Sequence, residues 1–149
     1  EVSENGARRS LAEGAAPHDY WRAFGARSVW SSGLDLLPSL RAALRIAEAL
    51  AAEHQPEVLD GMGRALAWRL YWWRGQDIAG RHDILALRGL SAAEPRLLWE
   101  GAGREVGPLP GCRTATAWRG ELEQVLNDEE LRAFDRGADA PAFSRPCAG

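Results

Sequence analysis

The chain has 149 residues, enough for one domain, and its 46% hydrophobic content can supply one core. Its 18 basic residues are all arginine and are outnumbered by 21 acidic residues, so the net charge of −3 gives no overall attraction to nucleic acid or anionic lipid. Charges interrupt every apolar run before the roughly 18 residues that would span a bilayer. We expect a soluble or peripheral protein. The first residue is Glu1 rather than methionine, which indicates a processed or incomplete chain without its targeting peptide.

The first half of the chain is expected to form an arm followed by three helices. Residues 1–17 are small and polar with little periodicity, which predicts an extended or weakly helical arm. Apolar residues then recur about every three to four positions, which predicts helices over 19–30, 38–53 and 56–75. Asp19 is a suitable N-cap for the first of these helices, and a proline opens each of the other two.

The second half is predicted to be helical with one strong break. A helix is expected over 77–90 and a shorter one over 94–104, before the stretch 107–111, which is rich in glycine and proline. A further helix is expected over 121–134, and the tail 137–149 is expected to lie extended over the surface. No alternating run of β-branched residues indicates a strand.

Together these elements predict an all-α protein. We expect about five to seven short helices over residues 18–136, packed as one compact domain that can wrap around an apolar cavity. The flanking segments 1–17 and 137–149 would be extended. We find no internal duplication in the sequence.

The segment 64–75, RALAWRLYWWRG, carries more aromatic surface than one core requires. Leu66 and Trp73 lie on the apolar stripe of the predicted helix, whereas Trp68 and Trp72 lie about 100° or more away from it. A second aromatic edge fits a flat ligand or a protein partner, so removing Trp68 and Trp72 together should leave the fold intact. The candidate contacts for a pigment or a partner are Trp30, Leu66, Trp68, Trp72, Trp73 and His54.

Motifs for catalysis and for metal binding are missing from the sequence. It contains no Gly-x-Ser-x-Gly, no glycine-rich phosphate loop and no His-Glu-x-x-His, so we expect no catalytic residue and no enzyme. His18, His54 and His82 are far apart in the chain and lack metal-ligand spacing, which favours solvated or capping roles and predicts no metal site. His54, just before a helix start, is the best candidate among them to bind an external group. An enzyme would have to use His82 beside Asp83.

Three other features favour ordinary structural interpretations. Arginines at 64, 69 and 74 among the aromatic residues would suit single-stranded nucleic acid, but three are few, and we expect no nucleic-acid partner. The acidic run 127–130 lacks calcium-loop spacing and fits a solvated or capping turn. Cys112 and Cys147 are interpreted as separate thiols, with a disulfide that fixes the tail as the alternative.

Short segments of the chain resemble one known family in their order. VWSSGL at 29–34 is similar to a Trp-Asn-Asn-Gly-Ile segment, LRAALRI at 40–46 to a Leu-x-Ala-Leu-Lys-Ala-Ile helix, and QPEVL at 55–59 to an Asp-Pro-Lys-Leu-Leu helix start. EPRLL at 94–98 gives a weaker likeness. On these segments, over roughly residues 20–100, the chain resembles one divergent module of the water-soluble peridinin–chlorophyll proteins of dinoflagellates.

This resemblance implies a non-catalytic light-harvesting module in the thylakoid lumen of a chloroplast. The module would bind a carotenoid such as peridinin and chlorophyll, or would dock on a photosystem or antenna complex, or on a second copy, as an accessory subunit. The family carries a histidine pair that approaches the chlorophyll magnesium, and Leu66 and Ala67 stand at the matching positions here. This departure predicts a pigment content different from that of the family.

The alternative interpretation is a helical protein–protein interaction, regulatory or immunity subunit without pigment. Tryptophan and arginine are enriched at the centres of protein interfaces, so the second aromatic edge fits a polypeptide partner as well as a pigment. The colour of the purified protein distinguishes the two interpretations.

Overall fold

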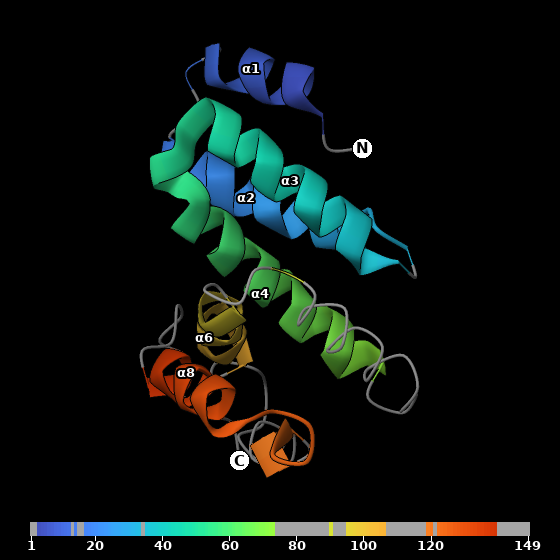
Figure 1. The fold of residues 1–149 in the computed structure, drawn as a ribbon, viewed down its shortest axis with the longest axis vertical. Coiled ribbons are helices and arrows are strands. Elements are labelled where there is room, and N and C mark those ends of the chain that lie inside the picture. The colour runs from blue at the N-terminus through green and yellow to red at the C-terminus, as the bar shows by residue number, and fades with distance from the viewer. Residues whose placement is uncertain are drawn as a thin grey trace.

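The computed structural model describes residues 3–12, 14, 17–33, 35–73, 90, 95–106, 119–120 and 122–139. The regular structure of these residues is entirely helical, which confirms the predicted all-α class. In chain order the elements are α1 (Glu4–Ala12), α2 (Pro17–Trp30), α3 (Leu36–Ala51), the 3₁₀ turn η1 (Ala52–His54), α4 (Gln55–Trp73), α6 (Pro95–Val106) and α8 (Asp128–Asp139) (Figure 1). None of the described helices has the length and hydropathy needed to cross a bilayer.

Helix α1 lies where an extended or weakly helical arm was expected. Ser3 Oγ accepts a hydrogen bond from the backbone N–H of Gly6 at 3.1 Å, which caps the first turn. Arg8 Nη2 and Glu4 Oε1 form an ion pair at 2.7 Å one turn apart. Ala7 is buried, so the helix also packs against the rest of the protein. Residues 4–12 are therefore helical because of local interactions that composition alone does not reveal.

The predicted helix 121–134 is interrupted, and α8 extends beyond its predicted end. Residue 122 is helical, residues 123–126 form a turn and a bend, and α8 begins at Asp128 after a reciprocal cap. Asn127 Oδ1 accepts from the N–H of Glu130 at 2.8 Å, while Glu130 Oε1 accepts from the N–H of Asn127 at 2.9 Å. The predicted capping turn in the acidic run is confirmed. Gly137 lies in α8 rather than in an extended tail.

Several other predicted features lie outside the described residues. These are residues 77–89 of the helix expected over 77–90, the break at 107–111, the tail from residue 140, and both cysteines, while Leu90 is described and forms a bend.

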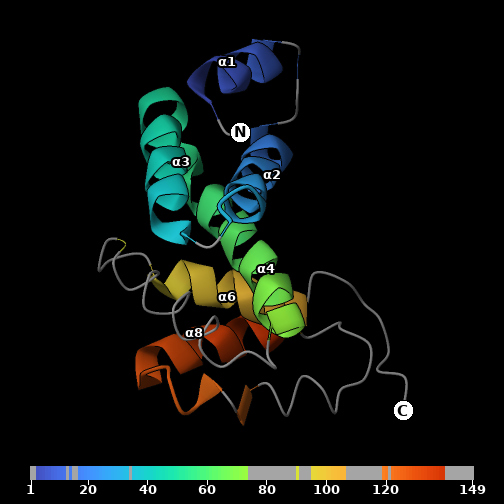
Figure 2. The same ribbon diagram turned by 90° about the vertical axis from the view of Figure 1, so that its right-hand side faces the viewer.

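Four of the helices lie one on the next along the long axis of the molecule. Helix α2 contacts α4, α4 contacts α6, and α6 contacts α8, while α3 packs beside α2 and α4 (Figures 1 and 2). Each of these three crossings brings two helix backbones together at glycines. The glycine pairs are Gly25 with Gly61, Gly63 with Gly101, and Gly103 with Gly137. A Cβ atom at Gly63 would overlap the carbonyl oxygen of Leu98, so the helices meet closely because no side chain intervenes.

The crossings form an internal repeat that the sequence analysis did not identify. Helices α4 and α6 both carry Gly-x-Gly, at 61–63 and 101–103, in which the first glycine contacts the preceding helix and the second contacts the following one. At the ends of the stack the outer glycine of this motif is replaced, by Ala23 in α2 and by Asp139 in α8. The described helices therefore form a short linear array in which each unit contacts its neighbours.

The core follows the apolar stripe predicted for the helix that begins near Pro56. Leu59, Met62 and Leu66 are fully buried in α4, and Ala67 is buried beside them. Trp21 and Trp99 add large buried rings from α2 and α6. Burial of these side chains stabilises the stack, at about 1.5–3 kcal/mol for each large apolar residue.

Candidate functional site

Among the residues selected from the sequence as pigment or partner contacts, those that the structure describes do not gather on one surface. Leu66 is fully buried in the core, whereas Trp30 is 56% exposed at the carboxyl end of α2. The side chains of Trp72 and Trp73 lie outside the described residues. Leu66 is thus available to neither a pigment nor a partner without unfolding, and Trp30 is freely accessible.

Trp68 lies in the contact between α4 and α6. Its indole N–H donates a hydrogen bond to Glu105 Oε1 at 2.8 Å, and its ring packs against the core while staying partly exposed. The position of Trp68 off the apolar stripe correctly indicates a second contact face. For this residue, however, the contact is with another helix of the same chain.

Replacing Trp68 by phenylalanine is expected to lower the free energy of unfolding by about 1.5 kcal/mol, because the carboxylate of Glu105 loses a donor. A double-mutant cycle with Glu105→Ala, measured by urea denaturation, checks this value. A coupling energy of zero would show that the hydrogen bond contributes nothing to the α4–α6 contact.

A polar pocket lies between α2, α4 and α6. Its volume is about 220 Å³, and its lining residues are Arg22, Pro56, Glu57, Asp60, Leu97, Glu100 and Arg104. Most of these side chains carry charge.

Asp60 forms ion pairs that connect the helices around this pocket. It is only 7% exposed, and its carboxylate pairs with three guanidinium groups. Arg22 Nε and Arg64 Nε each lie 2.9 Å from Asp60 Oδ2, and Arg104 pairs with Oδ1. Arg104 also pairs with Glu100 at 3.2 Å. Because the arginines come from α2, α4 and α6, a single buried carboxylate joins three helices.

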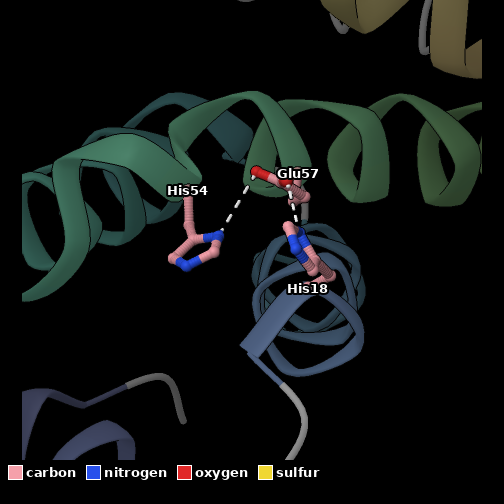
Figure 3. Close-up of side chains that lie close together, drawn as sticks. All are labelled: His18, His54 and Glu57. Carbon is pink, nitrogen blue, oxygen red and sulfur yellow. Dashed lines mark hydrogen bonds and ion pairs between the residues drawn. The ribbon is translucent and has the colours of Figure 1, made fainter.

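Two of the three histidines meet next to this pocket. His18 is in the first turn of α2, His54 ends η1, and Glu57 is in the first turn of α4 (Figure 3). His18 Nδ1 lies 2.7 Å from Glu57 Oε1, and His54 Nδ1 lies 3.7 Å from Glu57 Oε2. The two imidazole rings meet edge to face with centroids 5.0 Å apart. Glu57 also lines the pocket, so the cluster and the pocket adjoin.

The carboxyl group of Glu57 is held in its charged form. Burial raises its pKa, but the hydrogen bond with His18, a backbone hydrogen bond and the nearby imidazoles lower it by more, so the pKa lies below its ordinary value of 4.5. Glu57 is therefore an anion at neutral pH and can bind a cation.

The cluster offers two imidazole nitrogens and one carboxylate oxygen within 4.8 Å of one another. This donor set is one that first-row transition-metal dications accept. His18 and His54 are far apart in the chain, so the sequence predicts no metal site here. The pattern His54-x-x-Glu57 at a helix start was a local signal, but its third member depends on how α2 packs on α4.

Comparison with known proteins gives no relative: no family model, no curated protein and no solved structure matches this chain. The resemblance to the peridinin–chlorophyll proteins stays a prediction.

Proposed function

We propose that this chain is a non-catalytic helical module that docks on a partner protein through an exposed face of α2. The observation that carries this proposal is Trp30, a large apolar side chain that is 56% exposed on a well-anchored helix end. The face consists of Ala23, Arg27 and Trp30, which are exposed and lie on one side of the helix. Tryptophan and arginine contribute most to the binding energy of many protein interfaces.

The carboxyl end of α2 is fixed from inside the protein. Arg69 is 4% exposed and donates to the carbonyl oxygen of Val29 at 3.3 Å and to Ser32 Oγ at 2.8 Å. It also donates to the carbonyl oxygen of Gly33. Because these bonds hold the chain on both sides of Trp30, docking would require little ordering of that segment.

The glycine crossings favour a protein partner over an enclosed pigment. Where two helix backbones touch, there is no space for a carotenoid or a chlorophyll between the helices. The pocket of about 220 Å³ is also smaller than typical ligand pockets, which measure about 300–1,000 Å³. The resemblance to the antenna family makes a photosystem or antenna complex in the thylakoid lumen the first partner to test.

Replacing Trp30 by alanine is expected to weaken docking by about 30-fold, the effect of losing a hot-spot residue worth about 2 kcal/mol. The measurement is the fraction of the protein that migrates with a larger complex in a native extract. Because Trp30 is exposed, the free energy of unfolding should change by less than about 0.5 kcal/mol.

Arg45→Gln, an exposed change on α3, is the matched control and should leave the migration unchanged. A purified protein that is coloured and loses its visible absorption on solvent extraction would contradict the proposal in favour of pigment binding. A colourless protein that migrates alone, with or without Trp30, would also contradict it.

A further inference from the structure

We propose that His18, His54 and Glu57 form a binding site for a transition-metal dication such as Zn²⁺, which joins the first turn of α2 to the start of α4. The proposal is independent of the docking face, because the cluster lies in the opening turns of α2 and α4 and Trp30 lies at the far end of α2.

The distances between the donor atoms fit the coordination of one ion. Ligands held about 2.0–2.1 Å from one tetrahedral ion lie about 3.3 Å from one another. Here His18 Nδ1 and Glu57 Oε1 are 2.7 Å apart, and His54 Nδ1 and Glu57 Oε2 are 3.7 Å apart. All three ligand atoms lie within 4.8 Å of one another, so small side-chain rotations would bring them around one ion.

Two buried polar atoms of the cluster lack a hydrogen bond. His54 Nδ1 and Glu57 Oε2 are both shielded from solvent and make no hydrogen bond in the described structure. They face each other at a distance too long for a hydrogen bond (Figure 3). A buried polar atom without a partner is unfavourable, and a cation shared by the two atoms would satisfy both.

The surroundings of the two imidazoles also favour a bound cation. Glu53 Oε1 lies 3.9 Å from His54 Nε2, on the side of the ring opposite Nδ1. At this distance the contact is electrostatic rather than a hydrogen bond, and a negative charge beside Nε2 favours a cation at Nδ1. His18 is 70% exposed, which leaves a route for the ion and room for water to complete its coordination.

The donor chemistry selects the class of ion. Two imidazoles and one carboxylate suit zinc, cobalt, nickel and copper, whereas magnesium and calcium prefer sites built from oxygen alone. Binding also requires the His18 nitrogen to exchange its hydrogen bond with Glu57 for the metal, so any proton on that nitrogen leaves to solvent.

The test is titration of the full chain, without a polyhistidine tag, with Zn²⁺ and with Co²⁺. We expect one equivalent of Zn²⁺ by calorimetry, and a visible Co²⁺ spectrum without the charge-transfer band of a cysteine ligand. His18→Gln should reduce Zn²⁺ affinity by more than about 100-fold, since a lost ligand costs more than the 10- to 100-fold typical of outer-shell partners.

His82→Gln removes the remaining histidine and is the matched control, which should bind Zn²⁺ as the parent does. His18 is exposed, so its variant should keep the parent's far-ultraviolet circular dichroism and its unfolding midpoint without metal. Absence of stoichiometric Zn²⁺, unchanged affinity in His18→Gln, binding lost in His82→Gln, or a cysteine charge-transfer band would each overturn the proposal.

Discussion

Replacing Gly63 by alanine is expected to lower the free energy of unfolding by about 3 kcal/mol, the upper end of the range for overpacked sites. The new Cβ would overlap the carbonyl oxygen of Leu98 and would also lie within 3.0 Å of the backbone nitrogen of Ala102. Both atoms belong to the backbone of α6, which cannot move aside as a flexible side chain can. Helices α4 and α6 must therefore separate, which weakens the contact between them along its whole length.

Gly120→Ala provides the matched control for this change. A Cβ at Gly120 has nothing within 4 Å, and the residue is in a helical turn. Alanine there should leave the stability unchanged or raise it by up to about 1 kcal/mol. Urea denaturation of both variants checks the comparison. Equal stability of Gly63→Ala and the parent would contradict the close crossing of α4 and α6.

The helices could be predicted from the sequence because their signals are local. The stripe that contains Leu59, Met62 and Leu66 repeats within one helix, and it is buried as expected. The cap at Asn127 is also local, since its partner Glu130 is three residues away. The predicted helix boundaries were less accurate, because at each helix end the helical hydrogen bonds and those of turns or 3₁₀ structure are similar in energy.

The glycine crossings could not be predicted from the same signals. In sequence alone, a glycine inside a predicted helix is expected to destabilise that helix by about 1 kcal/mol relative to alanine. Gly63 and Gly101 suit their positions only because the backbone of the neighbouring helix lies against them.

The histidine cluster was missed for a related reason. His18 and His54 approach each other only because Gly25 and Gly61 allow α2 and α4 to pack closely. Both features depend on tertiary contacts between distant segments.

Asp60→Asn is expected to lower the free energy of unfolding by about 3 kcal/mol. Removing one partner of a buried ion pair typically costs about 3–5 kcal/mol, and the lower end applies because the three guanidinium groups are partly exposed. Asp60 is 7% exposed, and its carboxylate pairs with Arg22, Arg64 and Arg104. Asparagine keeps the shape but leaves three like charges close together, so the penalty exceeds that of a lost hydrogen bond.

Two further variants separate charge from shape in this prediction. Asp19→Asn removes a carboxylate that is 84% exposed and pairs with Arg22 at 3.5 Å, so it should change stability by less than about 0.5 kcal/mol. Adding Arg64→Gln to Asp60→Asn should recover part of the loss, because one of the unpaired charges is gone. Thermal or urea unfolding of the parent, Asp60→Asn, Arg64→Gln and the double variant measures this coupling. A double variant less stable than Asp60→Asn would mean that Arg64 stabilises α4 by packing rather than through Asp60. We expect the double variant to regain stability relative to Asp60→Asn, because one buried carboxylate neutralises arginines from α2, α4 and α6.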